Sequence, residues 1–262
     1  MNELILIKIG GSLIADKNKI YEINKQVVGK LVSSISKFLE KKKNSQLVIA
    51  NGAGSFGHYT VIKYNLNRLK GAYLTDLQKS GIGFVHSKVS YLNAYLNNEL
   101  SEQGVSVVSF SPISYLFKDE ELSLFAKPLL SALSLGLNIS FYGDLIFTKD
   151  KQTTVVSTEQ LLEIFVDKLL AKTAFKVSKV VFVTNVSGVL DNHGDVIKKI
   201  TQDFSSDQVN IFKVKKDVSG GMKIKLKTAL HFAKQGIKTY ICGVNDFENC
   251  LFDLPGGYTV VV

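Results

Sequence analysis

The chain is poor in cysteine, proline and arginine, and each shortage excludes something. Cys242 and Cys250 are the only cysteines among 262 residues, so neither a disulfide framework nor a four-cysteine zinc site is possible. Only three prolines occur, and no Pro/Ser-rich linker or low-complexity tract interrupts the sequence. This predicts one continuous domain over residues 1–262. Arg68 is the only arginine, so lysines and backbone N–H groups would have to hold any bound phosphate.

Several familiar signals are also missing. No apolar run reaches the ~20 residues that span a bilayer, and the first residues lead into a strand-like run without signal-peptide architecture. We therefore expect a cytoplasmic protein without a membrane partner. No G-x-x-x-x-G-K-[ST], H-R-D or D-F-G motif occurs, which excludes P-loop enzymes and protein kinases. No His, Cys or carboxylate cluster has metal-ligand spacing, so no protein metal site is predicted.

The formal net charge is +9, which raises the question of nucleic-acid binding. The lysines are scattered, however, and the run Lys41–Lys43 ends an amphipathic helix, where cations compensate the helix dipole. A solvated basic face is favoured over a nucleic-acid patch. Hydrophobic residues make up 45% of the chain, enough for a substantial core.

Hydrophobic periodicity predicts alternating strands and helices. Apolar runs predict strands at 4–9, 47–50, 105–110, 137–142, 179–184, 239–242 and 258–262, and a hairpin joining 145–147 to 153–156. Helical stripes run over 27–39 and 85–100, a capping box opens a helix from Ser157 to about Leu170, and another helix begins at Gly221. This pattern indicates an α/β fold, an open αβα sandwich with a mostly parallel central sheet.

Three glycine-rich turns dominate the sequence: Lys8–Ser12, Gly52–His58 and Asp217–Lys225. Glycine lets backbone N–H groups approach a ligand, and a turn leading into a helix offers an anion unpaired donors and a positive dipole end. Because ligands of parallel sheets bind at the carboxyl ends of strands, all three turns should lie near those ends. Three such turns predict a site that handles several phosphates.

Gly52–Gly57 also matches G-x-G-x-x-G, which leaves a dinucleotide-binding oxidoreductase as an alternative, with Asp76 eligible as its acidic residue. That fingerprint normally sits in the first βα unit, which here carries Lys8–Ser12 instead.

Among the lysines, Lys8 lies in an otherwise apolar strand, where a phosphate ligand is favoured over an edge-strand lysine with solvent access. Lys17 lies in a polar loop, where either interpretation holds. Lys225 follows Gly221 by four residues, so its side chain can reach back over the helix N-terminus.

His58 ends the second turn, where a ring N–H could donate to a phosphate. The other histidines, His86, His193 and His231, are interpreted as structural or exposed. Three carboxylates stand close to loop ends and could hold a lysine or help to bind Mg²⁺: Asp144, Glu159 and Asp217. For Glu159 and Asp217, simple helix capping is an equal alternative.

Taken in order, these residues resemble the amino acid kinase superfamily, most closely its isopentenyl phosphate kinase branch. The resemblance rests on five stretches: Lys8–Ser12 with Lys17, Gly52–His58, Gly83–Asn93, Tyr142–Asp144 and Asp217–Lys225. In the family, the histidine matched by His58 marks phosphate-accepting members and the related fosfomycin kinases. Three departures occur: Ser157-Thr-Glu159 replaces Ser-Gly-Asp, Thr184-Asn-Val-Ser-Gly188 replaces Thr-Asp-Val-Asp-Gly, and Ala53 stands where glycine is common.

The resemblance implies ATP-dependent phosphorylation of isopentenyl phosphate to isopentenyl diphosphate. It also implies a homodimer, an acceptor lobe over about 1–170, a nucleotide lobe over about 171–262, and Mg²⁺ carried on the ATP phosphates. Lys8 and the N–H groups of Gly10 and Gly11 would hold the transferring phosphoryl group, and Lys17 and Lys225 would neutralise charge on ATP. The remaining ATP-side residues are Ser12, Gly54, Thr184, Gly188 and Gly220. The acceptor side comprises Ala53, Gly57, His58, Gly143 and Asp144, and the apolar tail would lie near Ile82, Phe84 and Val85.

Two other functions stay open at this point. One is a kinase of the same fold that acts on a phosphonate such as fosfomycin. The other is a nucleotide-binding protein without catalysis, which the altered loops at Ser157–Glu159 and Thr184–Gly188 would favour.

Overall fold

The computed structural model describes residues 3–15, 19–66, 74–119, 122–125, 127–150, 152–204 and 221–262. Within these ranges the strands are β1 (Glu3–Ile9), β2 (Ser45–Asn51), β3 (Val107–Ser109), β4 (Leu116–Lys118), β5 (Leu122–Leu124), β6 (Asn138–Tyr142), β7 (Asp144–Thr148), β8 (Thr153–Val156), β9 (Val177–Val183), β10 (Lys199–Ile200), β11 (Lys238–Cys242) and β12 (Thr259–Val261). The α-helices are α1 (Gly11–Ile14), α2 (Lys25–Lys41), α3 (Gly54–Lys63), α4 (Asp76–Glu102), α5 (Pro112–Tyr115), α6 (Lys127–Ser134), α7 (Thr158–Ile164), α8 (Gly221–Ala233) and α9 (Phe247–Phe252).

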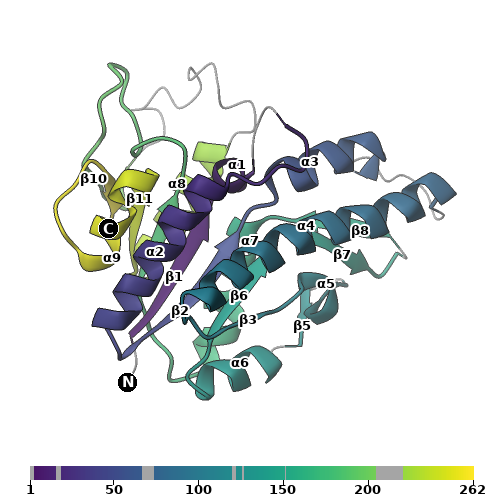
Figure 1. Cartoon of the computed structure of the whole chain (residues 1–262), viewed down its shortest axis with the longest axis horizontal. Helices are drawn as coiled ribbons and strands as arrows, with labels where there is room; N and C mark the ends of the chain where they lie inside the picture. Colours follow the sequence, from purple (N-terminus) through teal and green to yellow (C-terminus); the bar gives the residue numbers. More distant parts are fainter. Residues whose placement is uncertain are drawn as a thin grey trace.

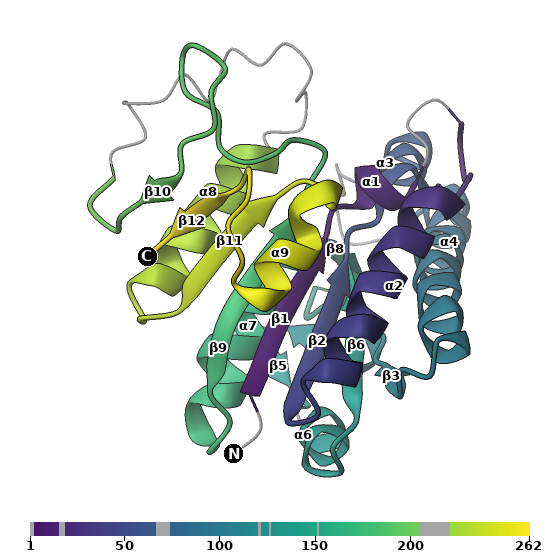
Figure 2. The ribbon, with the colours of Figure 1, turned by 60° about the vertical axis from the view of Figure 1, so that its left-hand side comes forward.

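Eight of these strands form one central sheet in the order β10-β12-β11-β9-β1-β2-β6-β3. Every neighbouring pair is parallel except β11 and β12. Figure 2 shows β9, β1 and β2 side by side in the middle of the sheet. The predicted α/β fold with a mostly parallel central sheet is confirmed. The sheet draws strands from both predicted lobes, and the division near residue 170 stays a prediction.

Helices cover both faces of the sheet, as Figures 1 and 2 show. Along β1, Leu4 and Leu6 pack in the core that includes α6, α7 and α8. Ile5 and Ile7 pack in the opposite core with α1, α2, α4 and α9. Because alternate residues of a strand share a face, Lys8 lies on the same face as Leu4 and Leu6, toward α7 and α8. This alternation determines where the Lys8 side chain can reach.

The two long helical stripes predicted from sequence are confirmed. Helix α2 buries Val28, Leu31, Val32, Ile35 and Phe38. Helix α4 buries Val85, Val89, Leu92, Leu96 and Leu100. Long amphipathic repeats of this kind are the pattern from which a helix is most readily predicted.

The region between α4 and β9 contains short helices and strands that the sequence did not predict. The predicted hairpin is confirmed as β7 and β8, but it belongs to a second sheet in the order β5-β4-β7-β8. The capping box at Ser157 and Gln160 is present with both of its hydrogen bonds. The helix it opens does not stay α-helical to Leu170, because residues Phe165–Leu169 form a π-helix and Leu170–Lys172 a 3₁₀ turn.

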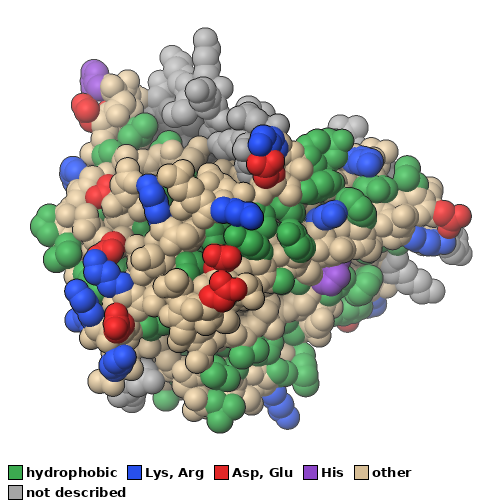
Figure 3. Space-filling view, viewed as in Figure 1, with side chains coloured by type: hydrophobic (Ala, Val, Ile, Leu, Met, Phe, Trp, Pro, Cys, Tyr) green, Lys and Arg blue, Asp and Glu red, His purple; other side chains and the backbone are tan. Residues whose placement is uncertain are grey.

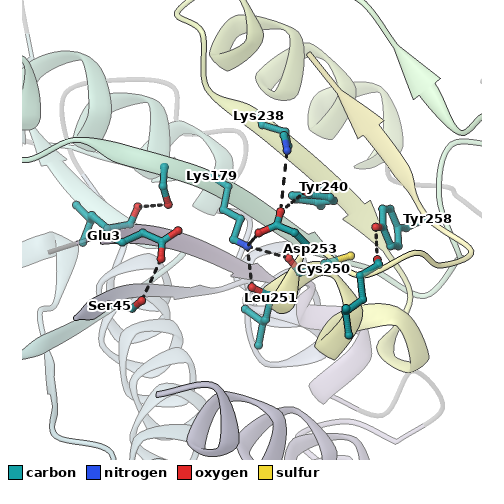
Figure 4. A network of polar contacts seen from close by, with 12 residues as sticks. Glu3, Ser45, Lys179, Lys238, Tyr240, Cys250, Leu251, Asp253 and Tyr258 are labelled. Atoms are coloured by element: carbon teal, nitrogen blue, oxygen red, sulfur yellow. Dashed lines mark hydrogen bonds and ion pairs between the residues drawn. The ribbon is translucent and has the colours of Figure 1, made fainter. Parts of the chain in front are cut away.

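A buried lysine ties the centre of the sheet to the C-terminal helix (Figure 4). Lys179 of β9 is 4% exposed, and its Nζ donates to the carbonyls of Leu251 (2.7 Å) and Cys250 (3.2 Å) at the end of α9. The same Nζ lies 2.6 Å from Oδ2 of Asp253. The other oxygen of this carboxylate, Oδ1, accepts a hydrogen bond from the Tyr240 hydroxyl. A lysine at this position satisfies carbonyls that have no partner within the helix. Lys179 therefore has an evident structural role.

Candidate active site

The residues that follow four neighbouring strands lie in one row at the carboxyl edge of the central sheet. The residue that follows each strand donates its N–H to the last carbonyl of the next strand. Thr184 donates to Cys242 (2.8 Å), Gly10 to Val183 (2.9 Å), Gly52 to Ile9 (2.9 Å) and Gly143 to Asn51 (3.2 Å). The order along the edge is thus Thr184, Gly10, Gly52 and Gly143. The expectation that these turns meet at the carboxyl ends is confirmed for the first two glycine turns.

This row corrects one expected role. The N–H of Gly10 is used by the carbonyl of Val183, so the prediction that it holds the transferring phosphoryl group is wrong for that donor. The adjacent N–H of Gly11 begins α1, where a helix has no internal acceptor for its first donors. Ser12 is exposed on the same short helix.

The first two glycine turns are packed directly against each other. A Cβ on Gly11 would lie 2.2 Å from the nitrogen of Gly54 and 2.6 Å from the carbonyl carbon of Gly52. Gly54 itself has φ +52 and faces the carbonyl of Gly11, so two requirements for glycine coincide there. These contacts are between backbones and leave no room for any side chain. The glycines therefore bring the two turns together, whatever ligand they bind.

Lys8 and Lys225 converge on Glu159 on the α7–α8 face. Nζ of Lys8 lies 2.9 Å from Oε1 of Glu159, and Nζ of Lys225 lies 3.9 Å from the same oxygen. Lys225 also donates to the carbonyl of Gly221 (3.0 Å), reaching back over the first turn of α8 as the sequence predicted. Glu159 stands in the first turn of α7, whose capping Ser157 fixes where that turn begins.

The Glu159 carboxylate stays ionised here. Its burial raises the pKa, but the charges of Lys8 and Lys225 and the Lys8 hydrogen bond outweigh burial and hold the pKa below its usual range. The lysine side chains are only 5% and 12% exposed. Glu159 thus brings two largely buried ammonium groups together on one face, and cations at such a place attract an anionic ligand.

Helix α3, which follows β2, carries His58. The helix begins at Gly54, after Ala53, and His58 lies in its second turn with an exposed side chain. Gly57 faces the other way: a Cβ there would lie 2.5 Å from Cβ of Ala53 and 3.4 Å from Cγ1 of Val89 on α4. Gly57 therefore allows α3 to pack closely against α4. Its role in substrate binding stays a prediction.

Asp144 and His86 form a pair that the sequence did not predict. Asp144 begins β7 directly after Gly143, and its Oδ2 lies 2.7 Å from Nδ1 of His86 on α4. Burial raises the pKa of Asp144, while hydrogen bonds from His86 and from the Leu145 N–H oppose that shift. His86 had been interpreted as structural or exposed. Its spacing from Val85 and Val89 on α4 would have placed it beside the buried stripe, but only the fold brings Asp144 to it.

The nucleotide side of the edge is partly described. Thr184 is 5% exposed and follows β9, as predicted. Gly188 is pressed against another strand, because a Cβ there would lie 2.5 Å from Oγ1 of Thr259. Packing alone explains that glycine. Three further predicted residues lie outside the described residues: Lys17, Asp217 and Gly220.

Further observations concern the surface. Exposed hydrophobic side chains gather over α3 and α4 in Figure 3, among them Tyr59, Ile62 and Tyr91. Within the described ranges, no three His, Cys, Asp or Glu side chains lie together so that they could hold a metal ion. None of the described helices is long and apolar enough to cross a membrane.

A family model with the description "Amino acid kinase family" matches residues 3–243, almost the whole chain. The chain belongs to the amino acid kinase family. It is therefore a small-molecule kinase, and membership implies ATP as the phosphoryl donor. This result excludes the dinucleotide-binding oxidoreductase that the Gly52–Gly57 motif had left as an alternative. Asp76, its candidate acidic residue, opens α4 with a side chain that is 98% exposed and paired with Lys79.

Individual relatives are distant. The chain is 25% identical over 235 residues to the isopentenyl phosphate kinase of Methanocaldococcus jannaschii, covering 85% of each chain. It is 26% identical over 250 residues to that of Haloferax volcanii, covering 92% of this chain and 95% of the relative. The acetylglutamate kinase of Endomicrobium trichonymphae is 25% identical over 251 residues, covering 91% and 92%.

Solved structures agree on the fold. An isopentenyl phosphate kinase structure superposes with a TM-score of 0.81 at 23% identity, covering 99% of this chain and all of that one. The UMP kinase of Ureaplasma parvum gives a TM-score of 0.62 at 15% identity, covering 100% and 99%. At these identities the likeness shows the fold and leaves the acceptor open.

Proposed function

We propose that this amino acid kinase transfers the γ-phosphoryl group of ATP to isopentenyl phosphate, giving isopentenyl diphosphate. The observation that carries the proposal is the exposed His58 on α3, one turn after the glycine turn that packs against the Lys8 turn. An exposed histidine on the helix that follows the second glycine turn suits an acceptor that is itself a phosphate. The relatives named isopentenyl phosphate kinase are consistent with it.

The chemistry supports a phosphate acceptor. A phosphomonoester is already anionic near neutral pH, so transfer needs no general base. Glu159, the carboxylate nearest to Lys8, is ion-paired and has a lowered pKa, which makes it a poor base. The main barrier is to bring two anions together and to stabilise charge on the transferred group. The lysine pair can do both.

The proposed roles follow the order along the sheet edge. Lys8, with the N–H of Gly11, holds the transferring phosphoryl group, and Lys225 neutralises charge on ATP. Thr184 lies beside the nucleotide, and Ala53, His58 and Gly143 line the acceptor side. Mg²⁺ would ride on the ATP phosphates and offset their charge, since a magnesium ion is commonly held by substrate phosphates and few carboxylates.

An ATP-consumption screen tests the proposal. The acceptors are isopentenyl phosphate, dimethylallyl phosphate, fosfomycin, UMP, N-acetylglutamate and carbamate, each with and without Mg²⁺. We expect turnover with isopentenyl phosphate at a kcat/KM at least tenfold above every non-isoprenoid acceptor. Preferred turnover of fosfomycin or N-acetylglutamate would replace the proposed acceptor, and ATP binding without transfer to any acceptor would indicate a non-catalytic protein.

A variant tests the carrying residue. His58→Ala should raise KM for the acceptor far more than KM for ATP, because His58 stands on the acceptor side. His193→Ala is the control, since His193 lies in an exposed turn. Unchanged acceptor kinetics in His58→Ala would remove His58 from the site.

A further inference from the structure

The inner face of α4 carries a row of polar side chains at helical spacing: His86, Ser90, Asn93 and Asn97. Each bonds to a neighbour in the buried interior. Ser90 Oγ lies 2.7 Å from the Tyr142 hydroxyl, Asn93 donates to Oδ1 of Asn51 (2.8 Å), and Asn97 donates to Asn93 (2.9 Å). His86 stands at the end of this row and bonds to Asp144 at 2.7 Å.

The contact between His86 and Asp144 joins a partly exposed ring to a buried carboxylate. The Asp144 side chain is 0% exposed, whereas the His86 side chain is 35% exposed. Nδ1 of the ring therefore faces a carboxylate that solvent does not reach. In this arrangement a buried carboxylate fixes the tautomer and direction of an imidazole by accepting its Nδ1–H, and leaves Nε2 for a ligand.

The pair lies beside the second glycine turn. Val85, the residue before His86, and Leu145, the residue after Asp144, share a small hydrophobic cluster that Ala53 of this turn packs against. Gly143, directly before Asp144, donates to the carbonyl of Asn51, and Gly52 is the next residue after Asn51. The residues next to His86 and Asp144 thus contact the second glycine turn, which leads into α3 and His58.

Among the described residues, Asp144 is the only carboxylate that contacts the His86 ring. Burial raises the pKa of Tyr142 and of Tyr115, so both nearby phenols stay neutral. Lys88, two residues along α4, stands over the rings of Tyr21 and Phe84, 5.1 Å from each centroid. When both ring nitrogens carry a proton, the imidazole can donate Nδ1–H to Asp144 and Nε2–H to an anion at the same time.

We infer that His86 is a second histidine for the acceptor phosphate, with Asp144 as the residue that positions it. His86 donates from Nε2 to a phosphate oxygen, while His58 approaches the same group from α3. This inference rests on the proposed function, because it assigns the acceptor side of that site. It adds a specific role for a residue whose sequence pattern indicated none.

The first test uses the wild-type protein and needs no substitution. The chain has four histidines, so an NMR spectrum of the ring Cε1–H groups contains four signals, one for each histidine. Isopentenyl phosphate, added without ATP, should shift the signals of His58 and His86 and leave those of His193 and His231. Single His→Gln variants assign the signals. A shift confined to His58 overturns the inference.

The second test separates ligand binding from structure. His86→Gln should raise KM for isopentenyl phosphate by ~10- to 100-fold, the effect of losing a hydrogen bond to a charged group, with KM for ATP within twofold. Asp144→Asn should raise the same KM and weaken the ligand-induced shift of the His86 signal. Ser90→Ala is the matched control, because it removes a neighbouring bond of the same polar row and should leave KM unchanged. Equal effects of Ser90→Ala and His86→Gln would reduce His86 to a structural residue.

The two proposals fail in different ways. If the wild type turns over isopentenyl phosphate but His86→Gln keeps its KM, the function stands and the inference falls. If no phosphomonoester is turned over, the function falls, and inorganic phosphate replaces isopentenyl phosphate in the NMR titration. A shift of the His86 signal with inorganic phosphate would then still support an anion site at this histidine, and a constant signal would exclude it.

Discussion

Oε1 of Glu159 lies 2.9 Å from Nζ of Lys8, although the two residues are far apart in the chain and come from α7 and β1. The same oxygen is 3.9 Å from Nζ of Lys225 on α8. One carboxylate therefore sets the positions of two lysines that belong to different secondary-structure elements.

Removing this carboxylate should disable the enzyme while leaving it folded. Glu159→Gln removes the carboxylate charge that pairs with Lys8 and Lys225, and even a displacement of ~1 Å of a positioning group can cost about 100-fold in rate. We expect kcat to fall by about that factor in the ATP-consumption assay. Glu163→Gln is the matched control, because Glu163 lies on the same helix but binds the Thr228 hydroxyl (2.7 Å). A similar loss in both variants would contradict a specific role for Glu159.

The lowered pKa of Glu159 predicts how this interaction depends on pH. A carboxyl group whose pKa in the folded state lies below the ordinary 4.5 stabilises the fold above that value. Its contribution is lost as pH falls through the folded-state pKa. The unfolding free energies of wild type and Glu159→Gln should therefore differ most above pH 5 and converge below 4.5. Denaturant titrations at several pH values measure this, and a constant difference would be evidence against the ion pair.

The backbone contact between the first two glycine turns should not tolerate a methyl group. Gly11→Ala places a Cβ 2.2 Å from the Gly54 nitrogen, so a backbone must move. We expect a loss of at least ~2 kcal/mol in the free energy of unfolding, together with loss of activity. Gly29→Ala, within α2 and with nothing within 4 Å, should instead stabilise by ~0.5–1 kcal/mol. Normal activity in folded Gly11→Ala would show that the turns can separate without cost to the site.

Lys179 is buried in the sheet like Lys8, but its substitution should lower stability without changing catalysis. Lys179→Met removes three hydrogen bonds at the end of α9 and should cost about 1–3 kcal/mol of stability. The kcat of the folded fraction should not change, because Lys179 contacts α9 and lies on the face opposite Lys8. Lys238→Met is the control, since its Nζ is half exposed and 4.0 Å from Asp253. Loss of kcat in folded Lys179→Met would connect this network to the site.

Much of the fold was predictable from the sequence because its signals are local. Three signals each depend on residues close in the chain: the apolar run of β1, the long stripes of α2 and α4, and the capping box at Ser157. Short elements such as α5, β4 and β10 carry too few residues for a period to show. The π-helix after Ile164 was missed because its apolar residues, Phe165 and Leu169, also fit an α-helical stripe.

The candidate site was predictable where chemistry depends on a glycine turn and a nearby lysine, as at Lys8 and Lys225. It was not predictable where two strands or a strand and a helix must meet. His86 looked ordinary because its partner, Asp144, is 58 residues away and comes to it only when β7 packs beneath α4. The bond from the Gly10 N–H was not predictable because the carbonyl that accepts it belongs to β9, far along the chain.

The Lys179 network has a consequence for synthesis of the chain on the ribosome. Lys179 lies in a central strand, but its carboxylate partner Asp253 is made 74 residues later. Until then, the ammonium group of Lys179 has none of these acceptors, so its side chain must stay in solvent and this face of β9 stays uncovered. The middle of the sheet therefore cannot reach its final stability before residues 247–253 have been made.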